Sequence, residues 1–283
     1  MPDRGLNRKV RLLHLSDLHF GAEDVEALAR VAEFAERVKP DAVVVSGDLT
    51  QTGAKREFES ARDWLRAIKG KAIVTPGNHD TPVLDMTARV FSPFERYNRY
   101  LGEFDAVDRL VELGEGRIRI AAINTARGVQ ARRNWADGVV DIDDLNAALG
   151  LLAGGAPDAW RLLVCHHPLV EPGHSQIGVD TLRGAEALER AAASKVDAIL
   201  TGHIHDAFAH AVETAARPMV QMGAGTLSTR LRSTPPSFCV IEIDGDTLTQ
   251  EIIQIEPDGL QIRRNYVWTA GANPPAAAPA AQA

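Results

Sequence analysis

The fold is decided by residues 10–19, which read VRLLHLSDLH, because the same pattern returns twice before residue 81. Residues 41–50 read DAVVVSGDLT, and residues 71–80 read KAIVTPGNHD. Each stretch is an apolar run, typical of a strand covered on both faces, followed by a polar group that contains aspartate. Apolar residues at helical spacing separate the three runs, over 25–38 and 58–68. This order predicts a β-α-β-α-β unit with a parallel sheet and right-handed crossovers.

The α/β alternation continues further along the chain. Apolar runs at 118–124, 162–165 and 196–201 predict buried strands, with helices at 141–152 and 185–194 between them. Beyond residue 206 the pattern changes, because an Asp244-Gly245 turn separates two alternating runs at 238–243 and 247–255. We therefore expect a second, antiparallel layer after residue 206.

Residues 81–115 lack this rhythm and carry aromatic and arginine side chains. This composition predicts a small helical cap insertion over the functional site. We expect a flexible N-terminus over 1–9, one domain over 10–269, and a disordered Ala/Pro tail over 270–283.

Composition excludes several classes of protein. The chain has 31 basic and 38 acidic residues, a formal charge of −7, which argues against a broad nucleic-acid surface. Its two cysteines, Cys165 and Cys239, lie in apolar runs and support neither a disulfide framework nor a cysteine-zinc site. No apolar run approaches the ~20 residues that span a bilayer, and the N-terminus has no signal-peptide core. We expect a cytoplasmic protein and leave open whether it forms a homo-oligomer.

Polar side chains follow five of the predicted strands. In chain order they are Asp17 and His19; Asp48; Asn78, His79 and Asp80; His166 and His167; and His203 and His205. Because the carboxyl ends of parallel strands face one crevice, these side chains should converge. So many buried carboxylates and imidazoles need compensation, which a pair of divalent cations would supply. Oxygen and imidazole donors without thiolate suit Mn, Fe, Zn, Co or Ni.

These segments together resemble a known family. Asp-x-His, Gly-Asp, Gly-Asn-His-Asp, His-x-Pro and Gly-His-x-His, in this order, are similar to the motifs of the calcineurin-like metallophosphoesterases. The likeness is greatest to the bacterial class III cyclic nucleotide phosphodiesterase branch, because Leu49 and Thr50 follow Gly47-Asp48. The resemblance implies a four-layer α/β/β/α sandwich with mixed sheets. Leu169, where a second proline is frequent, and the segment 223–238 depart from the branch and leave the substrate open.

The resemblance also implies a role for each motif residue. One metal would be held by Asp17, His19, Asp48 and His205, and a second by Asp48, Asn78, His166 and His203. Asp48 would bridge the two metals, and a hydroxide between them would attack phosphorus. His79 would contact the phosphate and protonate or stabilise the leaving oxygen, and Asp80 would orient His79.

The implied activity is hydrolysis of a small phosphodiester, such as a cyclic nucleotide or a glycerophosphodiester. Alternatives within the superfamily are a phosphomonoesterase, a pyrophosphohydrolase or a nuclease. A non-catalytic binding scaffold is the remaining alternative, and it ranks last because every ligand position and His79 are filled.

Substrate contacts are expected outside the metal core. Tyr97 and Tyr100 of the cap could stack a base, or could simply pack a small helix. Arg230 and Arg232 could clamp phosphate oxygens, or could be solvated loop charges. His174 is the last candidate for a substrate contact. We interpret His14 and His210 as ordinary hydrogen-bonded histidines outside the site, and His167 as either a supporting residue or a surface residue.

Overall fold

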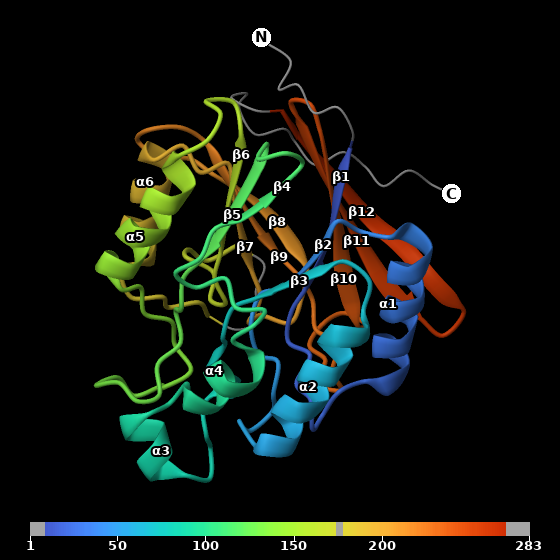
Figure 1. Ribbon diagram of the computed structural model, residues 1–283, viewed down its shortest axis with the longest axis vertical. Helices are drawn as coiled ribbons and strands as arrows, with labels where there is room; N and C mark the ends of the chain where they lie inside the picture. Colours follow the sequence, from blue (N-terminus) through green and yellow to red (C-terminus); the bar gives the residue numbers. More distant parts are fainter. Residues whose placement is uncertain (1–8, 174–177, 270–283) are drawn as a thin grey trace.

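The computed structural model describes residues 9–173 and 178–269, within which two six-stranded sheets pack face to face (Figure 1). The first sheet has the strand order β12-β11-β10-β1-β2-β3. Its strands are β1 (Val10–Leu15), β2 (Ala42–Val45), β3 (Lys71–Val74), β10 (Ser237–Asp244), β11 (Thr247–Glu256) and β12 (Gly259–Thr269). The second sheet has the order β4-β5-β6-β7-β9-β8. Its strands are β4 (Val111–Leu113), β5 (Ile118–Ala122), β6 (Trp160–Val164), β7 (Ala198–Thr201), β8 (Phe208–Val212) and β9 (Met219–Gly223).

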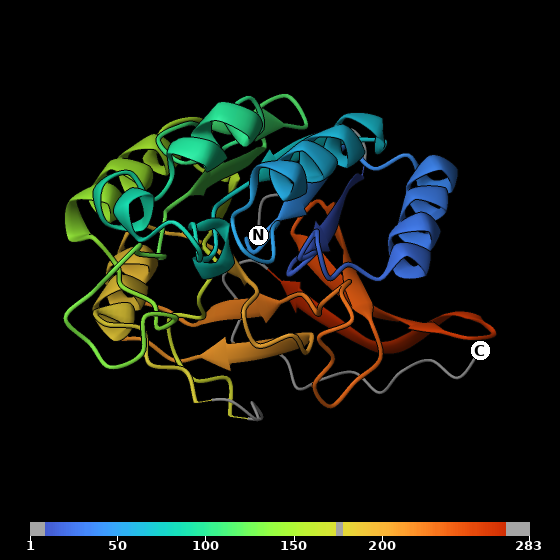
Figure 2. The ribbon, with the colours of Figure 1, turned by 90° about the horizontal axis from the view of Figure 1, so that it is seen from below.

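Helices cover the outer face of each sheet, which gives the expected α/β/β/α sandwich (Figure 2). The first sheet is covered by α1 (Val25–Val38), α2 (Lys55–Ala67) and α4 (Glu95–Leu101), and the second by α5 (Ile142–Ala153) and α6 (Gly184–Ala193). Two further helices are short: α3 (Met86–Phe91) and the 3₁₀ turn η1 (Asn78–Asp80). One apolar cluster lies between the sheets, and one lies under the helices on each side.

The strand β1 shows how the sequence builds these layers. Leu12 belongs to the core between the sheets, whereas Leu13 and Leu15 pack under the helices, because successive side chains of a strand point to opposite faces. His14 is fully buried, and its Nε2 lies 3.0 Å from Ser46 Oγ. It is therefore a hydrogen-bonded core residue, as the sequence predicts.

The parallel strands of each sheet end in register. Leu15 is paired with Val45, and Val45 with Val74; in the second sheet Ala122 is paired with Val164, and Val164 with Leu200. The chain leaves each of these strands at the same level, so the polar segments that follow them are brought together at one end of the sandwich.

The C-terminal strands correct one expectation. The predicted hairpin exists as β10 and β11, but it extends the first sheet beside β1 rather than forming a separate antiparallel layer. The strands β8 and β9 instead join the second sheet, where β9 runs parallel to β7. Both sheets are mixed because the late antiparallel strands are added to edges of parallel cores.

The predicted cap also changes. Residues 86–91 and 95–101 are helical, but residues 111–113 form the edge strand β4, which pairs with β5. Tyr97 is 1% exposed, and its ring meets Phe58 edge-on at 6.5 Å, while the Tyr100 ring stacks on Phe58 at 6.2 Å. The two tyrosines therefore attach α4 to α2. Base stacking by Tyr97 is wrong, because a buried ring presents no face to a ligand.

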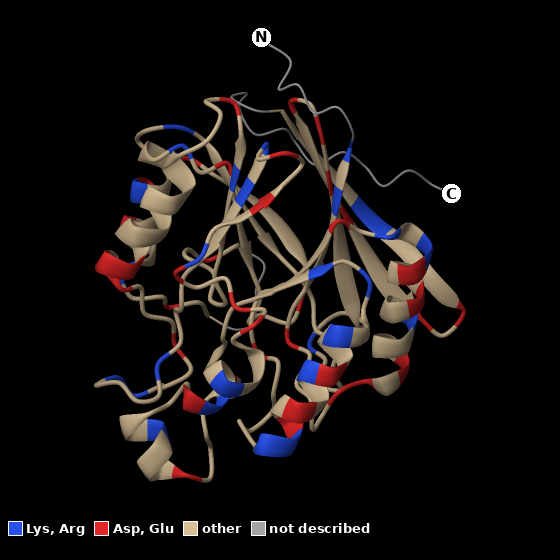
Figure 3. Cartoon of the chain, in the orientation of Figure 1, with Lys and Arg blue, Asp and Glu red and all other residues tan. Residues whose placement is uncertain are grey.

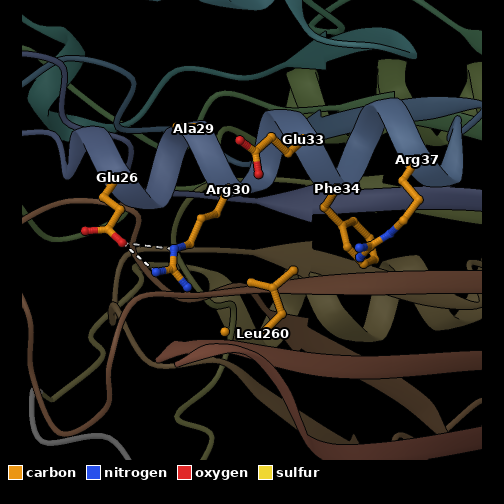
Figure 4. Close-up of a pocket in the computed structure, with 8 residues that line it drawn as sticks. Glu26, Ala29, Arg30, Glu33, Phe34, Arg37 and Leu260 are labelled. Carbon is orange, nitrogen blue, oxygen red and sulfur yellow. Dashed lines mark hydrogen bonds and ion pairs between the residues drawn. The ribbon is translucent and has the colours of Figure 1, made fainter. Parts of the chain in front are cut away.

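Charges are interspersed by sign along α1 and α2 (Figure 3). A groove of about 610 Å³ runs between α1 and the start of β12, where Glu26 holds Arg30 and the Arg37 guanidinium lies over Phe34 (Figure 4). This groove contains none of the motif residues.

No helix of the described residues is long and apolar enough to cross a membrane.

The packing of α4 leads to a stability prediction. Tyr97→Ala should lower the free energy of unfolding by about 3–5 kcal/mol, because it removes a fully buried aromatic ring. Tyr97→Phe should cost only about 1 kcal/mol, because it removes just the hydrogen bond from the hydroxyl to Asp105 Oδ1 (3.1 Å). Urea unfolding measures both. Tyr100→Ala is the control, with a smaller loss expected for a partly exposed ring; a smaller loss for Tyr97→Ala than for Tyr100→Ala would contradict this packing.

Candidate metal centre

The seven predicted ligands lie together at the ends of β1, β2, β3, β6 and β7, and we call them the strand-end cluster. Its members are Asp17, His19, Asp48, Asn78, His166, His203 and His205. Five of these residues have left-handed backbone, with φ between 45° and 71°, which is unfavourable for residues other than glycine. They are Asp17, His19, Asp48, His203 and His205. Such strain is tolerated where surrounding structure imposes it, and it is typical of functional sites.

Backbone hydrogen bonds between neighbouring strand ends hold these turns. Asp17 N donates to Gly47 O (3.1 Å), His19 N donates to Asp48 O (3.0 Å), and Gly202 N donates to His166 O (2.9 Å). Gly47 itself has a φ of 96°, and any side chain at this position would overlap the His166 ring. The glycine is therefore required both by its backbone conformation and by the close approach of the imidazole.

The first part of the cluster surrounds Asp17 Oδ1. This oxygen lies 3.2 Å from His205 Nε2 and 3.7 Å from His19 Nε2, and the two Nε2 atoms are 3.3 Å apart. Asp48 Oδ2 lies 3.8 Å from His19 Nε2. These are the four residues that the resemblance assigns to one metal.

The second part surrounds the other side of Asp48. His166 Nε2 lies 3.3 Å from Asp48 Oδ2 and 3.2 Å from Asn78 Oδ1. The His203 ring centroid is 5.2 Å from that of His166. Asp48 Oδ2 thus faces an imidazole nitrogen of each part, which is the arrangement that a shared ligand requires.

Backbone carbonyls decide which nitrogen of each imidazole faces the centre. His19 Nδ1 lies 3.2 Å from Thr50 O, His166 Nδ1 lies 2.8 Å from Ser46 O, and His205 Nδ1 lies 2.6 Å from Arg230 O. Because a carbonyl oxygen only accepts hydrogen bonds, each Nδ1 carries the hydrogen, and in the neutral ring Nε2 carries the lone pair. In the neutral rings, three Nε2 lone pairs would therefore point toward the two carboxylates, which is the orientation of histidine ligands held by outer partners.

The buried charges of the cluster call for a cation. Burial opposes charge on His166, but the charge and hydrogen bond of Asp48 outweigh it and raise its pKa to about 9. Burial likewise opposes charge on His205, and Asp17 outweighs it and raises its pKa. Burial would raise the pKa of Asp48, but His166 and His79 lower it well below its usual range. A bound cation would take the place of these protons.

One buried atom supports this fit directly. Within the described residues, Asp17 Oδ1 is buried and accepts no hydrogen bond of regular geometry, and its contact with His205 Nε2 (3.2 Å) is an ion pair only when that ring is protonated. Donor atoms of Asp17, His19 and His205 all lie within 4.8 Å of one another, and so do those of Asp17, Asp48 and His166. A buried carboxylate oxygen among imidazole nitrogens suits a divalent metal ion.

His79 lies beside the cluster, with its ring centroid 4.8 Å from that of His19. Its backbone N donates to Asp48 Oδ1 (2.8 Å), and its Nδ1 donates to Gln51 O (2.7 Å). Its Nε2 accepts from Arg230 Nη1 (2.9 Å). The ring nitrogen that could meet a leaving oxygen is therefore held by an arginine.

The role expected for Asp80 is not supported by its contacts. Its carboxylate is fully buried and accepts hydrogen bonds from Leu49 N (3.2 Å), Thr50 N (2.8 Å) and Gly77 N (2.9 Å). Burial, and next the charge of Asp48, raise its pKa to about 7. Asp80 ties the segment after β2 to the segment after β3. Gln51 O, not Asp80, orients the His79 ring, because the Asp80 carboxylate is used by the backbone.

The remaining candidate residues differ in whether their side chains reach the strand-end cluster. His167 is buried, with Nδ1 2.8 Å from Thr125 Oγ1 and Nε2 2.9 Å from Ala136 O, so both nitrogens are engaged outside the cluster. Arg230 reaches the site, whereas Arg232 is exposed and forms no hydrogen bond or ion pair with a described residue, so we place it outside the site. His174 lies outside the described residues.

Sequence reasoning missed the backbone carbonyls that orient the imidazole rings. Four carbonyls hold the Nδ1 atoms, and no side-chain motif signals a backbone carbonyl; they belong to Ser46, Thr50, Gln51 and Arg230. It also missed the buried Thr226, whose hydroxyl donates to Asp17 O (2.8 Å) from the loop after β9. The only available signal was proximity to the Gly-Asp motif, which would have indicated Thr50 and Gln51.

Comparison with known proteins bears on this site. Residues 10–207 match the family model of the calcineurin-like phosphoesterases. The chain is 29% identical over 208 residues to a probable cyclic nucleotide phosphodiesterase of Synechococcus sp., covering 70% of this chain and 74% of that protein. It is 24% identical over 274 residues to the 3′,5′-cyclic adenosine monophosphate phosphodiesterase CpdA of Escherichia coli K12, covering 86% and 89%.

Two further likenesses are more limited, one in the length matched and the other in sequence identity. A glycerophosphodiester phosphodiesterase, GpdQ of Enterobacter lignolyticus, is 36% identical over 80 residues, which is 24% of this chain and 29% of that protein. Among solved structures, a dimetal phosphatase from Danio rerio aligns with a TM-score of 0.62 at 13% identity, covering 92% of this chain and 99% of that one. At this identity the structural likeness concerns the fold.

The position of Asp48 leads to a prediction about metal content. Asp48→Asn should lose most of the bound metal after loading with Mn²⁺, because a neutral amide cannot balance two divalent cations. Elemental analysis of the purified variant measures this. Asp105→Asn is the matched control, since Asp105 is a half-buried carboxylate of the α4 region and should leave metal content unchanged. Full metal content in Asp48→Asn would show that Asp48 is not a shared ligand.

Proposed function

This chain belongs to the calcineurin-like phosphoesterase family and is a metal-dependent phosphoester hydrolase, and on that premise we propose that it hydrolyses small phosphodiesters, such as cyclic nucleotides or glycerophosphodiesters, with two divalent cations. The observation that carries the proposal is the strand-end cluster itself. Two buried carboxylates face three inward Nε2 atoms, and Asp17 Oδ1 accepts no hydrogen bond of regular geometry among the described residues. This donor set fits a pair of cations that share Asp48.

Each of the two parts of the strand-end cluster would bind one cation. Asp17, His19 and His205 would hold one cation, Asn78, His166 and His203 the other, and Asp48 both. When bound, such a pair lowers the pKa of a water and stabilises the charge that develops on phosphate oxygens. Donors of oxygen and imidazole type support Mn, Fe, Zn, Co or Ni.

His79 would act on the leaving group. Gln51 O fixes its Nδ1–H, so Nε2 is the atom that would hold a proton for the leaving oxygen. The ring is positioned by its own backbone bond to Asp48, which ties the acid to the residue that would bridge the cations. Asp80 would keep the two segments in place without touching the substrate.

The relatives support a diester more than a monoester. Two relatives that each match at least 70% of this chain are named as cyclic nucleotide phosphodiesterases, and a third, matched over a shorter stretch, as a glycerophosphodiester phosphodiesterase.

Both cysteines are buried free thiols, which supports the proposal that the enzyme works in a reducing compartment such as the cytoplasm.

A substrate panel tests the proposed activity. We expect the protein loaded with Mn²⁺ to hydrolyse 3′,5′-cyclic AMP, glycerophosphoethanolamine or bis(p-nitrophenyl) phosphate with a kcat/KM at least ten times that for p-nitrophenyl phosphate. Phosphate or nitrophenolate release measures each rate, and chelation followed by Mn²⁺, Fe²⁺, Zn²⁺, Co²⁺ or Ni²⁺ identifies the supporting metals. Faster hydrolysis of the monoester would replace this proposal with a phosphomonoesterase.

The role of His79 leads to a second prediction. His79→Ala should keep its metals but lower kcat by ~100-fold, with the largest loss for diesters that have poor leaving groups, because a positioned acid contributes about this much. Rates on aryl diesters of graded leaving-group pKa measure the dependence. His210→Ala on β8 is the matched control and should retain activity. An equal loss for all leaving groups would indicate that His79 only positions the phosphate.

A further inference from the structure

Arg230 lies in the loop between β9 and β10, and this loop is anchored behind the metal centre. The Thr226 hydroxyl donates to Asp17 O (2.8 Å), and Arg230 N donates to Ser228 Oγ (3.2 Å). Thr226 and Ser228 are fully buried. The loop therefore brings Arg230 to the cluster from a fixed base. Its carbonyl holds His205 Nδ1, and its side chain points to His79 on the other sheet.

The Arg230 guanidinium is bound only by neutral groups. Its Nη1 donates to His79 Nε2 (2.9 Å) and to Gln51 Oε1 (3.2 Å). Arg11, by contrast, pairs with Glu242 (2.6 Å), and Arg217 pairs with Asp197 (2.8 Å). Within residues 9–173 and 178–269, Arg230 forms no ion pair with a carboxylate. A permanent charge is thus held beside the metal centre with no anion assigned to it.

The contact with His79 conflicts with the role proposed for that histidine. While Arg230 donates to Nε2, this nitrogen cannot carry the proton that a leaving oxygen would receive, because its single lone pair is already used. The arginine must therefore leave His79 when substrate binds. A phosphate oxygen is the stronger acceptor, because guanidinium-phosphate bonds are assisted by charge and are frequently bidentate.

We propose that Arg230 is a substrate-binding residue whose guanidinium moves from His79 Nε2 to a non-bridging oxygen of the substrate phosphate. The same movement frees the lone pair of His79 Nε2, which can then take a proton from solvent water and give it to the leaving oxygen, so that binding of the phosphate and release of His79 are one event. This inference rests on the proposed phosphoester substrate. It assigns recognition of the phosphate to the loop after β9.

Binding of inorganic phosphate to the Mn²⁺-loaded protein is the direct test. Arg230→Ala should raise the phosphate Kd by about 10- to 100-fold, the range for a hydrogen bond between charged groups. Arg230→Lys should lie between wild type and alanine, because it keeps the charge but loses the planar fork. Arg232→Ala removes the same charge from the same loop and should change the Kd by less than about twofold. Calorimetry measures binding without turnover.

Three further readouts separate binding from a structural role. Metal content should be unchanged in Arg230→Ala, because the carbonyl that holds His205 belongs to the backbone. The kcat/KM for bis(p-nitrophenyl) phosphate should fall at least 10-fold, and millimolar guanidinium chloride should restore part of it where sodium chloride does not. In a His79→Ala background, Arg230→Ala should still weaken phosphate binding by a similar factor.

Several outcomes would contradict the role of Arg230 or the proposed function. An unchanged phosphate Kd in Arg230→Ala overturns the proposal, and so does a rise in kcat/KM, which would make Arg230 only a restraint on His79. A loss of phosphate affinity that disappears in the His79→Ala background would show that Arg230 acts only through His79. If the wild-type protein binds phosphate through Arg230 but hydrolyses no phosphoester, the proposed function fails while the anion site remains.

Discussion

Two carboxylates, Asp17 and Asp48, are buried at the point where the two sheets meet, and the rest of the site exists to accommodate them. Buried charge of one sign is costly unless it is compensated. The compensation comes from imidazoles on both sheets: His19, His166 and His205 each place Nε2 within 3.8 Å of a carboxylate oxygen. Burial and charge together therefore bind the two halves of the sandwich to one another through a cluster that suits divalent cations.

This arrangement carries a cost in backbone strain. Left-handed residues at Asp17, Asp48 and His205 turn the chain sharply off its strands, and neighbouring strand ends hold the turns by hydrogen bonds. Backbone carbonyls set the imidazole tautomers, so that Nε2 of each ring faces the carboxylates. Donors held in this way by the scaffold limit the entropy that is lost on binding.

We expect selectivity for substrate to arise from parts of the chain that do not bind metal. The helix α4 contributes to stability, because Tyr97 and Tyr100 pack on Phe58. The loop after β9, in contrast, is anchored on Asp17 and brings Arg230 against His79. It belongs to the segment 223–238, which departs from the class III pattern. Groups that touch what the phosphate carries should be sought along this loop.

The sequence by itself determined the parallel cores and the convergence of the candidate metal ligands, because apolar runs that end in polar motifs are local patterns and parallel strands end at a common edge. Residues 10–19, 41–50 and 71–80 were enough to predict where Asp17, Asp48 and Asn78 would meet. Only the tertiary structure decided that β10–β12 extend the first sheet, that Tyr97 is buried, that Asp80 holds backbone amides and that Arg230 contacts His79. These features depend on contacts between residues that are distant in the chain. They also depend on backbone carbonyls, which have the same chemistry at every position and therefore cannot be recognised in a sequence.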